Sequence, residues 1–185
     1  MKKFLPILIV IVLIVAIFVG VYNNLVQSAE DVDGAWAQVE NILKKRADLI
    51  PNLVETVKGY ATHEEDIFVK VTEARSKVMA ATSPEEAAAA NEELTRALGD
   101  INVVVENYPE LKANENFLSL QAELSSIENE LSTERMRYND KVKVFNKDVK
   151  RFPRNLLAKM FGFSPKEYFQ IGEADKETPK VDFNK

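Results

Sequence analysis

The chain has 185 residues, a formal net charge of −5, one histidine and no cysteine. The lack of cysteine excludes disulfides, thiolate metal sites and cysteine nucleophiles, although it does not identify the redox compartment. Seven prolines and six glycines leave long stretches rich in Ala, Glu, Lys and Leu, a composition typical of an all-α protein.

The first predicted element is an uncharged run of nineteen residues, Phe4 to Tyr22. Fifteen of them are Phe, Leu, Ile or Val, and about twenty apolar residues in a helix span the hydrocarbon core of a bilayer. Each such side chain contributes about −0.3 to −0.6 kcal/mol to insertion, which sums to about −5 to −9 kcal/mol. The run predicts a single transmembrane anchor within residues 1–26.

A cleaved secretory signal peptide is the alternative to this anchor. It needs a shorter apolar core and a small-x-small cleavage site soon after it. Cleavage after Ala29 would place Gln27 at the −3 position, a poor fit, and cleavage after Ser28 would place Val26 there, a weak one. The uncleaved anchor is the better interpretation.

Charges on either side of the run bear on its orientation. Lys2 and Lys3 favour a cytoplasmic N-terminus, which places the remaining chain outside the cytoplasm. Lys44, Lys45 and Arg46 lie at the far limit of the counting window on the other side and weaken this preference.

An amphipathic pattern begins directly after the anchor and continues to Tyr60. Its apolar positions follow alternating steps of three and four, which places them on one face of a helix. They are Leu25, Ala29, Val32, Trp36, Val39, Leu43, Ile50, Leu53, Val57 and Tyr60. Because the pattern keeps its phase through Pro51, we expect a kink there rather than a loop. The membrane helix is therefore predicted to continue into the first helix of the domain, as far as Gly59.

Two helix-start signals follow. Thr62 and Glu65 have the spacing of a capping box, which predicts a second helix from there to about Thr82. Ser83-Pro84-Glu85-Glu86 supplies an N-cap residue, a proline at the first helical position and a glutamate at the third. The third helix starts there and is predicted to stop at Asn107-Tyr108-Pro109.

The fourth predicted helix is long, from about Asn114 to Phe152. The short connections imply antiparallel neighbours, so residues 27–163 are predicted to form an up-and-down four-helix bundle with long first and fourth helices. A three-helix alternative fuses the first and second helices through Gly59. Residues 164–185 are expected to form a C-terminal tail that is disordered from Glu173 onward.

Several segments together resemble the bacterial LemA family. They are Tyr22 to Val26, Trp36 to Glu40, Arg46 to Val54, Tyr108 to Ala113, Arg135 to Asn139 and Phe152-Pro153 with Asn155. The resemblance covers nearly all of residues 22–163. It implies a small bacterial membrane protein with an N-terminal anchor and an antiparallel helical bundle. It implies no enzymatic activity, and it links the chain to the cell envelope and, in one branch of the family, to organelle-like membranes.

Two groups of polar residues interrupt the apolar faces. Arg46, Asp48 and Asn52 could form a polar pocket for a ligand, although a buried, paired arginine that sets the helix register is the simpler interpretation. Asn139 and Asn146 are seven residues apart and lie on one stripe of the fourth helix. Such a stripe either fixes the register of the bundle or binds a partner helix.

No catalytic constellation is present in the sequence. His63 with Glu64, Glu65 and Asp66 is weak evidence for a metal site, because zinc sites gather three or four spaced ligands and acids suit a first helical turn. There is no Ser/His/Asp set, no glycine-rich phosphate loop and no H-E-x-x-H motif. We therefore expect no enzyme, no cofactor and no small-molecule substrate. Nucleic-acid binding is not expected either, because the basic region lacks an aromatic platform.

Charge changes sign along the chain. Residues 27–134 carry twenty-two acidic and nine basic residues, whereas residues 135–159 carry nine basic and two acidic ones. The end of the basic region combines cations with large apolar side chains over residues 150–163. Its candidate lipid contacts are Lys150, Arg151, Phe152, Arg154, Leu157, Lys159 and Phe161.

Antiparallel packing would return this segment to the bilayer surface, where it could bind lipid or remodel the membrane. The alternative is that its apolar residues Phe152, Leu156, Met160 and Phe161 close the base of the bundle. The sequence as a whole predicts a membrane-anchored, non-catalytic scaffold or adaptor that binds protein partners of the envelope.

Overall fold

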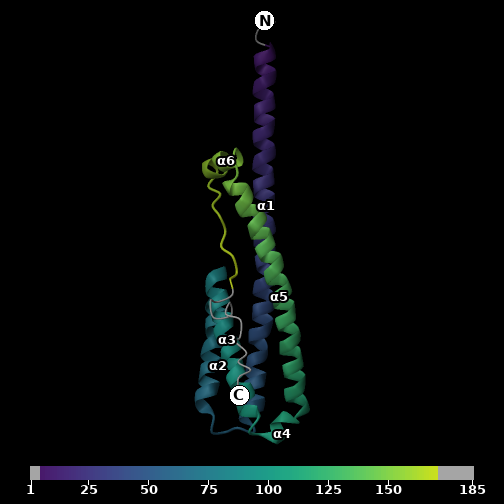
Figure 1. Cartoon of the computed structure of the whole chain (residues 1–185), viewed down its shortest axis with the longest axis vertical. Coiled ribbons are helices and arrows are strands. Elements are labelled where there is room, and N and C mark those ends of the chain that lie inside the picture. The colour runs from purple at the N-terminus through teal and green to yellow at the C-terminus, as the bar shows by residue number, and fades with distance from the viewer. Residues whose placement is uncertain (1–4, 171–185) are drawn as a thin grey trace, which may run out of the picture. The chain divides into compact units, whose positions relative to one another are not determined.

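The structure is a computed structural model that describes residues 5–170, and in that part of the chain every regular element is an α-helix (Figure 1). The helices are α1 (Leu5–Lys58), α2 (Glu65–Ala80), α3 (Pro84–Val105), α4 (Pro109–Lys112), α5 (Glu115–Lys150) and α6 (Arg154–Met160). The all-α prediction is confirmed, while the up-and-down order of a four-helix bundle stays a prediction.

Helix α1 is continuous over 54 residues and contains Pro51. It carries the uncharged run and the first amphipathic pattern without a break, as expected. It is also the one helix among the described residues whose length and composition suffice to cross a membrane. Lys2 and Lys3, on which the predicted orientation rests, lie outside the described residues.

The connection between α1 and α2 corrects two expectations. Helix α1 ends at Lys58 and α2 begins at Glu65, so the three-helix alternative that fused them through Gly59 is wrong. The predicted capping box is wrong as well, because Glu64 occupies the N-cap position without a side-chain hydrogen bond to the helix. Thr62 lies two residues too early to cap a helix that starts at Glu65.

The start of α3 agrees with the sequence prediction in detail. The Ser83 hydroxyl accepts a hydrogen bond from the backbone N–H of Glu86 at 3.2 Å, and Pro84 opens the helix. The Glu86 carboxylate reaches back to the backbone N–H and hydroxyl of Thr82, both at 2.9 Å. These bonds hold the pKa of Glu86 below its usual range and satisfy amides that would otherwise lack partners.

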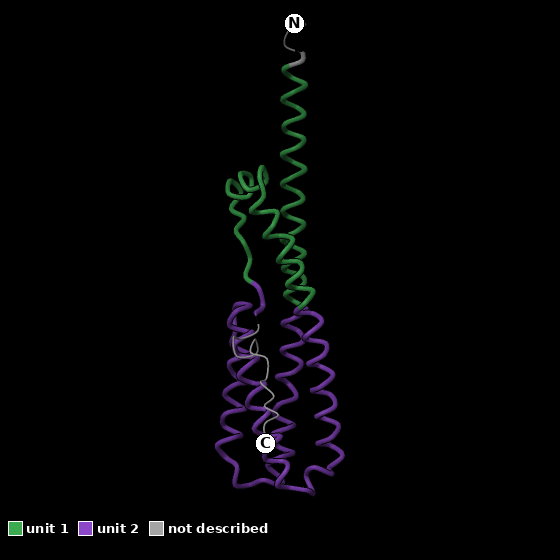
Figure 2. The backbone as a smooth tube through the Cα atoms, in the orientation of Figure 1, with its two compact units in different colours: residues 1–37, 136–167 green, residues 38–135, 168–185 purple. Residues whose placement is uncertain are grey.

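The chain divides into two compact units (Figure 2). Unit 1 combines residues 1–37 with 136–167, and unit 2 combines residues 38–135 with 168–185. Helices α1 and α5 contribute residues to both units. In unit 2, α2 packs beside α3, and the small buried residues Ala74, Ala87, Ala90 and Ala97 allow the two backbones to approach closely.

Two short helices, α4 and α6, were not predicted. Each has a proline at or just before its first turn, Pro109 in α4 and Pro153 before α6. They contain four and seven residues, too few to display a helical period in the sequence.

Candidate functional site

Helix α6 has one buried and one exposed apolar face. Leu157 and Ala158 are buried, whereas Leu156 and Met160 are 59% and 62% exposed. Positions four apart lie on the same face of a helix, so Leu156 and Met160 form one exposed stripe. Phe152, four residues before Leu156, is 75% exposed.

The exposure of these side chains changes which residues of the segment 150–163 can contact lipid. Leu157 was a predicted lipid contact, but it faces the interior of unit 1 and is not available to a membrane. The sequence placed Leu156 and Met160 only among the residues that would close the base of the bundle, but both are more than half exposed.

Helix α6 and the residues after it contact α1 where the apolar run, Phe4 to Tyr22, ends. The ring of Tyr22 is 4.7 Å from the ring of Phe161 and 6.2 Å from that of Phe163, measured between centroids. The Arg154 guanidinium donates a hydrogen bond to the Asn24 side-chain oxygen at 3.1 Å. Helix α6 therefore lies beside residues 22–24 of α1 (Figure 1).

The cations of the segment fall into two groups. Arg154 pairs with Asp148 at 2.7 Å and so serves to hold α6 in place. Lys150, Arg151 and Lys159 are exposed, and none of them forms an ion pair within residues 5–170. These three charges are the ones available to an outside ligand.

An extended strap, residues 163–167, follows α6 and is held by side chains of α1 and α5. Asn146 is 6% exposed, and its amide donates to the Lys166 carbonyl at 2.8 Å and accepts from the Lys166 N–H at 2.7 Å. The Lys166 ammonium pairs with Asp33 at 2.7 Å. A side-chain amide that pairs with both backbone groups of one residue fixes that residue's position and satisfies its own hydrogen bonds.

Tyr138 gives the strap a further attachment. Its hydroxyl donates to the Glu167 carbonyl at 2.7 Å, and its ring lies 5.3 Å from that of Trp36. Burial, and then the charges of Asp33 and Glu167, raise the pKa of Tyr138 to about 12.

Asn139 is half-buried and makes an interaction of its own. The disorder predicted from Glu173 onward falls outside the described residues.

The predicted polar group around Arg46 is only partly assembled. Arg46 is 4% exposed; it donates to the Asn91 side-chain oxygen and pairs with Glu128 at 2.9 Å. Burial lowers the pKa of Arg46, and the charge of Glu128 opposes that shift. Asp48 and Asn52 are exposed on α1 and do not contribute.

The partners of Arg46 were missed in the sequence. Asn91 lies in an alanine-rich stretch of α3, and Glu128 is one of many glutamates in α5. A cavity of about 340 Å³ borders the cluster, and the Arg46 Nε atom is buried there without a hydrogen-bond partner. The Arg46 guanidinium and the Glu128 carboxylate carry opposite charges, so the pair is electrically neutral.

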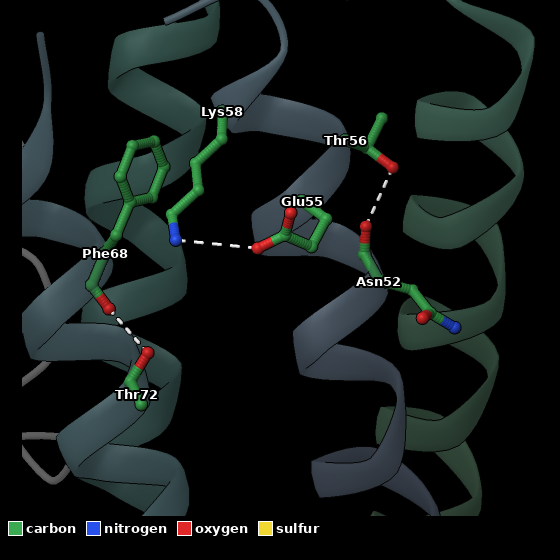
Figure 3. Close-up of polar contacts among 6 residues, drawn as sticks. All are labelled: Asn52, Glu55, Thr56, Lys58, Phe68 and Thr72. Carbon is green, nitrogen blue, oxygen red and sulfur yellow. Dashed lines mark hydrogen bonds and ion pairs between the residues drawn. The ribbon is translucent and has the colours of Figure 1, made fainter. Parts of the chain in front are cut away.

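A second cleft, of about 480 Å³, lies in unit 2 between the end of α1 and α2. Phe68 is buried, Val69 is 48% exposed, and Glu65 and Glu73 stand at the rim. The Lys58 ammonium lies 5.6 Å from the centre of the Phe68 ring and 3.5 Å from the Glu55 carboxylate (Figure 3). The cleft thus combines an apolar surface with charges of both signs.

Other contacts drawn around this cleft are internal to single helices. The Asn52 carbonyl accepts from the Thr56 hydroxyl at 2.7 Å, and the Phe68 carbonyl accepts from the Thr72 hydroxyl at 2.8 Å (Figure 3). His63 is exposed, and over residues 5–170 no three His, Asp or Glu side chains lie close enough to hold a metal ion.

Comparison with known proteins agrees with the resemblance in the sequence. The model of the LemA family matches residues 35–183. Protein LemA of Metamycoplasma hominis is 27% identical over 164 residues, which cover 86% of this chain and 74% of that protein. Magnetosome protein MamQ 2 of Paramagnetospirillum magneticum is 25% identical over 189 residues, which cover 86% and 70%. Magnetosome protein MamQ of Magnetospirillum gryphiswaldense is 23% identical over the same length.

Proposed function

Because the chain belongs to the LemA family, we propose that it is a non-catalytic scaffold of the bacterial cell envelope, anchored by α1 and binding a protein partner. The observation that carries the proposal is the continuity of α1, which joins an uncharged run to amphipathic turns without a break. A continuous helix of this kind tethers the domain, and any ligand bound to it, to the membrane. The names of the relatives designate no enzyme, and two of them refer to the magnetosome.

The cleft between α1 and α2 is the proposed partner site. Phe68 and Val69 offer apolar area, and Glu65 and Glu73 add negative charge at the rim. Interfaces combine an apolar centre with a polar rim, and charge complementarity selects the partner. The fitting partner is a basic amphipathic helix whose apolar side chains cover Val69 and whose cations meet the two glutamates.

The domain is proposed to lie outside the cytoplasm. The support is the pair of lysines before the uncharged run, since basic residues are retained on the cytoplasmic side. Protease added to intact spheroplasts is expected to digest the domain. Digestion only after lysis would place it in the cytoplasm and would restrict the partner to cytoplasmic proteins.

Site-specific photo-crosslinking in native membranes tests the partner site. A photoreactive phenylalanine analogue at position 69 is expected to form an adduct with a second protein, and the same analogue at the exposed Asp100 position serves as the control. The adduct should disappear in a Glu65→Lys, Glu73→Lys double variant. Equal adducts at both positions, or adducts insensitive to the charge reversal, would contradict the proposed cleft.

A further inference from the structure

We infer that α6 is a second membrane contact of this protein. Phe152, Leu156 and Met160 enter the boundary between headgroups and acyl chains, while Lys150, Arg151 and Lys159 bind anionic phospholipid headgroups. The inference rests on the membrane anchoring proposed above, and it adds a lipid ligand for a surface that the scaffold proposal does not use.

The depth of α6 follows from its contacts with α1. The apolar run of nineteen residues, Phe4 to Tyr22, is followed by Asn23 and Asn24, and at 1.5 Å per residue its length is about 28 Å, close to the thickness of a bilayer's hydrocarbon core. Tyrosine is enriched at the membrane–water boundary, because its ring is apolar and its hydroxyl is polar. Tyr22 contacts Phe161, and Asn24 accepts from Arg154, so α6 lies at the depth of the headgroups.

The exposed side of α6 and of the turn before it, which contains Phe152, has the composition of an interfacial helix. Phe152, Leu156 and Met160 are each more than half exposed, and the opposite face, with Leu157 and Ala158, is already buried in unit 1. Interfacial helices place their apolar face about 5–10 Å into the headgroup and acyl boundary and keep cations on the polar side. The exposed stripe is therefore not part of the hydrophobic core, because the residues of α6 that face the core are Leu157 and Ala158.

The basic residues indicate which lipid is bound. Lys150, Arg151 and Lys159 flank the exposed stripe and are unpaired within the described part of the chain. Basic segments next to a membrane anchor are attracted to anionic leaflets, and the attraction decays within a Debye length of the surface. Anionic phospholipid complements these charges, whereas a zwitterionic headgroup does not.

The position of α6 is fixed before any lipid binds. Phe163 contacts the rings of Tyr22 and Phe145, and the Asn146 side chain holds both backbone groups of Lys166. Arg154 pairs with Asp148 at the start of α6, so the helix is attached on both sides. A preorganised surface does not have to be ordered when it binds.

Thiol protection in vesicles tests the inference with the full chain. The sequence has no cysteine, so Met160→Cys introduces a single thiol on the α6 stripe. Val144→Cys, on an exposed apolar position of α5 in unit 1, is the matched control. In vesicles with one third anionic phospholipid, we expect N-ethylmaleimide to modify the α6 thiol at least tenfold more slowly than the control, each rate being normalised to that in denaturant. Equal rates would overturn the inference.

A lipid contact and a protein contact respond differently to dilution. Protection that persists when the protein-to-lipid ratio is lowered tenfold supports the bilayer as the occupant. Protection that disappears would assign the face to another copy of the chain and overturn the inference. In an Arg151→Glu, Lys159→Glu double variant, the α6 thiol should react at least threefold faster in anionic vesicles. In zwitterionic vesicles its rate should not change. A variant that keeps full protection in anionic vesicles would overturn the choice of anionic lipid.

Carbonate extraction of the same vesicles separates this inference from the proposed function. A chain that stays in the membrane but leaves its α6 thiol fully reactive keeps the anchor and refutes the second contact. A chain that carbonate releases refutes the anchor and the second contact together.

Discussion

Units 1 and 2 share two helices but are held together differently. Unit 1 buries large side chains such as Tyr138 and Phe145, and ion pairs join distant parts of its sequence, such as Lys141 with Asp31 and Lys166 with Asp33. Unit 2 relies on neighbouring helices, small apolar residues and one buried arginine, Arg46. One helix can therefore pack in two different environments. In unit 1 the extended strap packs against α1 and α5, whereas in unit 2 neighbouring helices pack closely against each other.

The largest expected effect concerns the aromatic core of unit 1. Phe145 is 1% exposed and packs against Phe163, so Phe145→Ala should destabilise unit 1 by about 3–5 kcal/mol. Hydrogen exchange should show lost amide protection in residues 136–151 and retained protection in α2 and α3. In the matched Leu94→Ala variant of unit 2, the loss should fall on α2 and α3 instead. Identical exchange patterns in both variants would mean that the units unfold as one.

The buried arginine provides the next largest effect. Arg46→Ala leaves Asn91 and Glu128 without their partner, and we expect a cost of about 2–3 kcal/mol, because Glu128 remains partly solvated. Lys45→Ala removes an exposed pair with Glu130 and should cost less than about 0.5 kcal/mol. Urea unfolding of both variants measures the difference, and equal costs would contradict the assigned role of Arg46.

Tyr138 makes unit 1 sensitive to alkaline pH. Its pKa is raised to about 12, so the folded state keeps the phenol proton above pH 10, where the unfolded chain has lost it. This contribution is complete below pH 10 and is lost as the pH rises toward 12, a fall of about 1–3 kcal/mol. Urea unfolding at pH 9 and at pH 11.5 measures it. The Tyr138→Phe variant should lose about 1 kcal/mol at pH 9 and show a correspondingly smaller further fall.

The smallest expected effect distinguishes the two predicted helix starts of unit 2. Ser83→Ala removes the hydrogen bond to the Glu86 N–H and should cost about 1 kcal/mol. Thr62 caps no helix, so Thr62→Ala should change the free energy of unfolding by less than about 0.5 kcal/mol. Thermal unfolding of the two variants compares them, and an equal cost would restore the capping box at Thr62.

The sequence predicts the elements of this fold better than their contacts. Periodic apolar positions and Ser83-Pro84 were enough to locate α1, α3 and α5, because both signals are local. The role of Asn146 could not be predicted, since its partner is an extended strap twenty residues away that has no period. The contact of α6 with Tyr22 was anticipated only as a general return toward the bilayer. Which residues of α6 face outward depends on the turn at Phe152-Pro153.

The long-range contacts of unit 1 also set an order of assembly during synthesis. Asn24, Asp31 and Asp33 find their partners in Arg154, Lys141 and Lys166, which leave the ribosome more than a hundred residues later. Helices α2 and α3 can pair while translation is still in progress, because both precede those partners in the chain. The apolar start of α1 therefore leaves the ribosome first, and unit 1, which contains it, closes last.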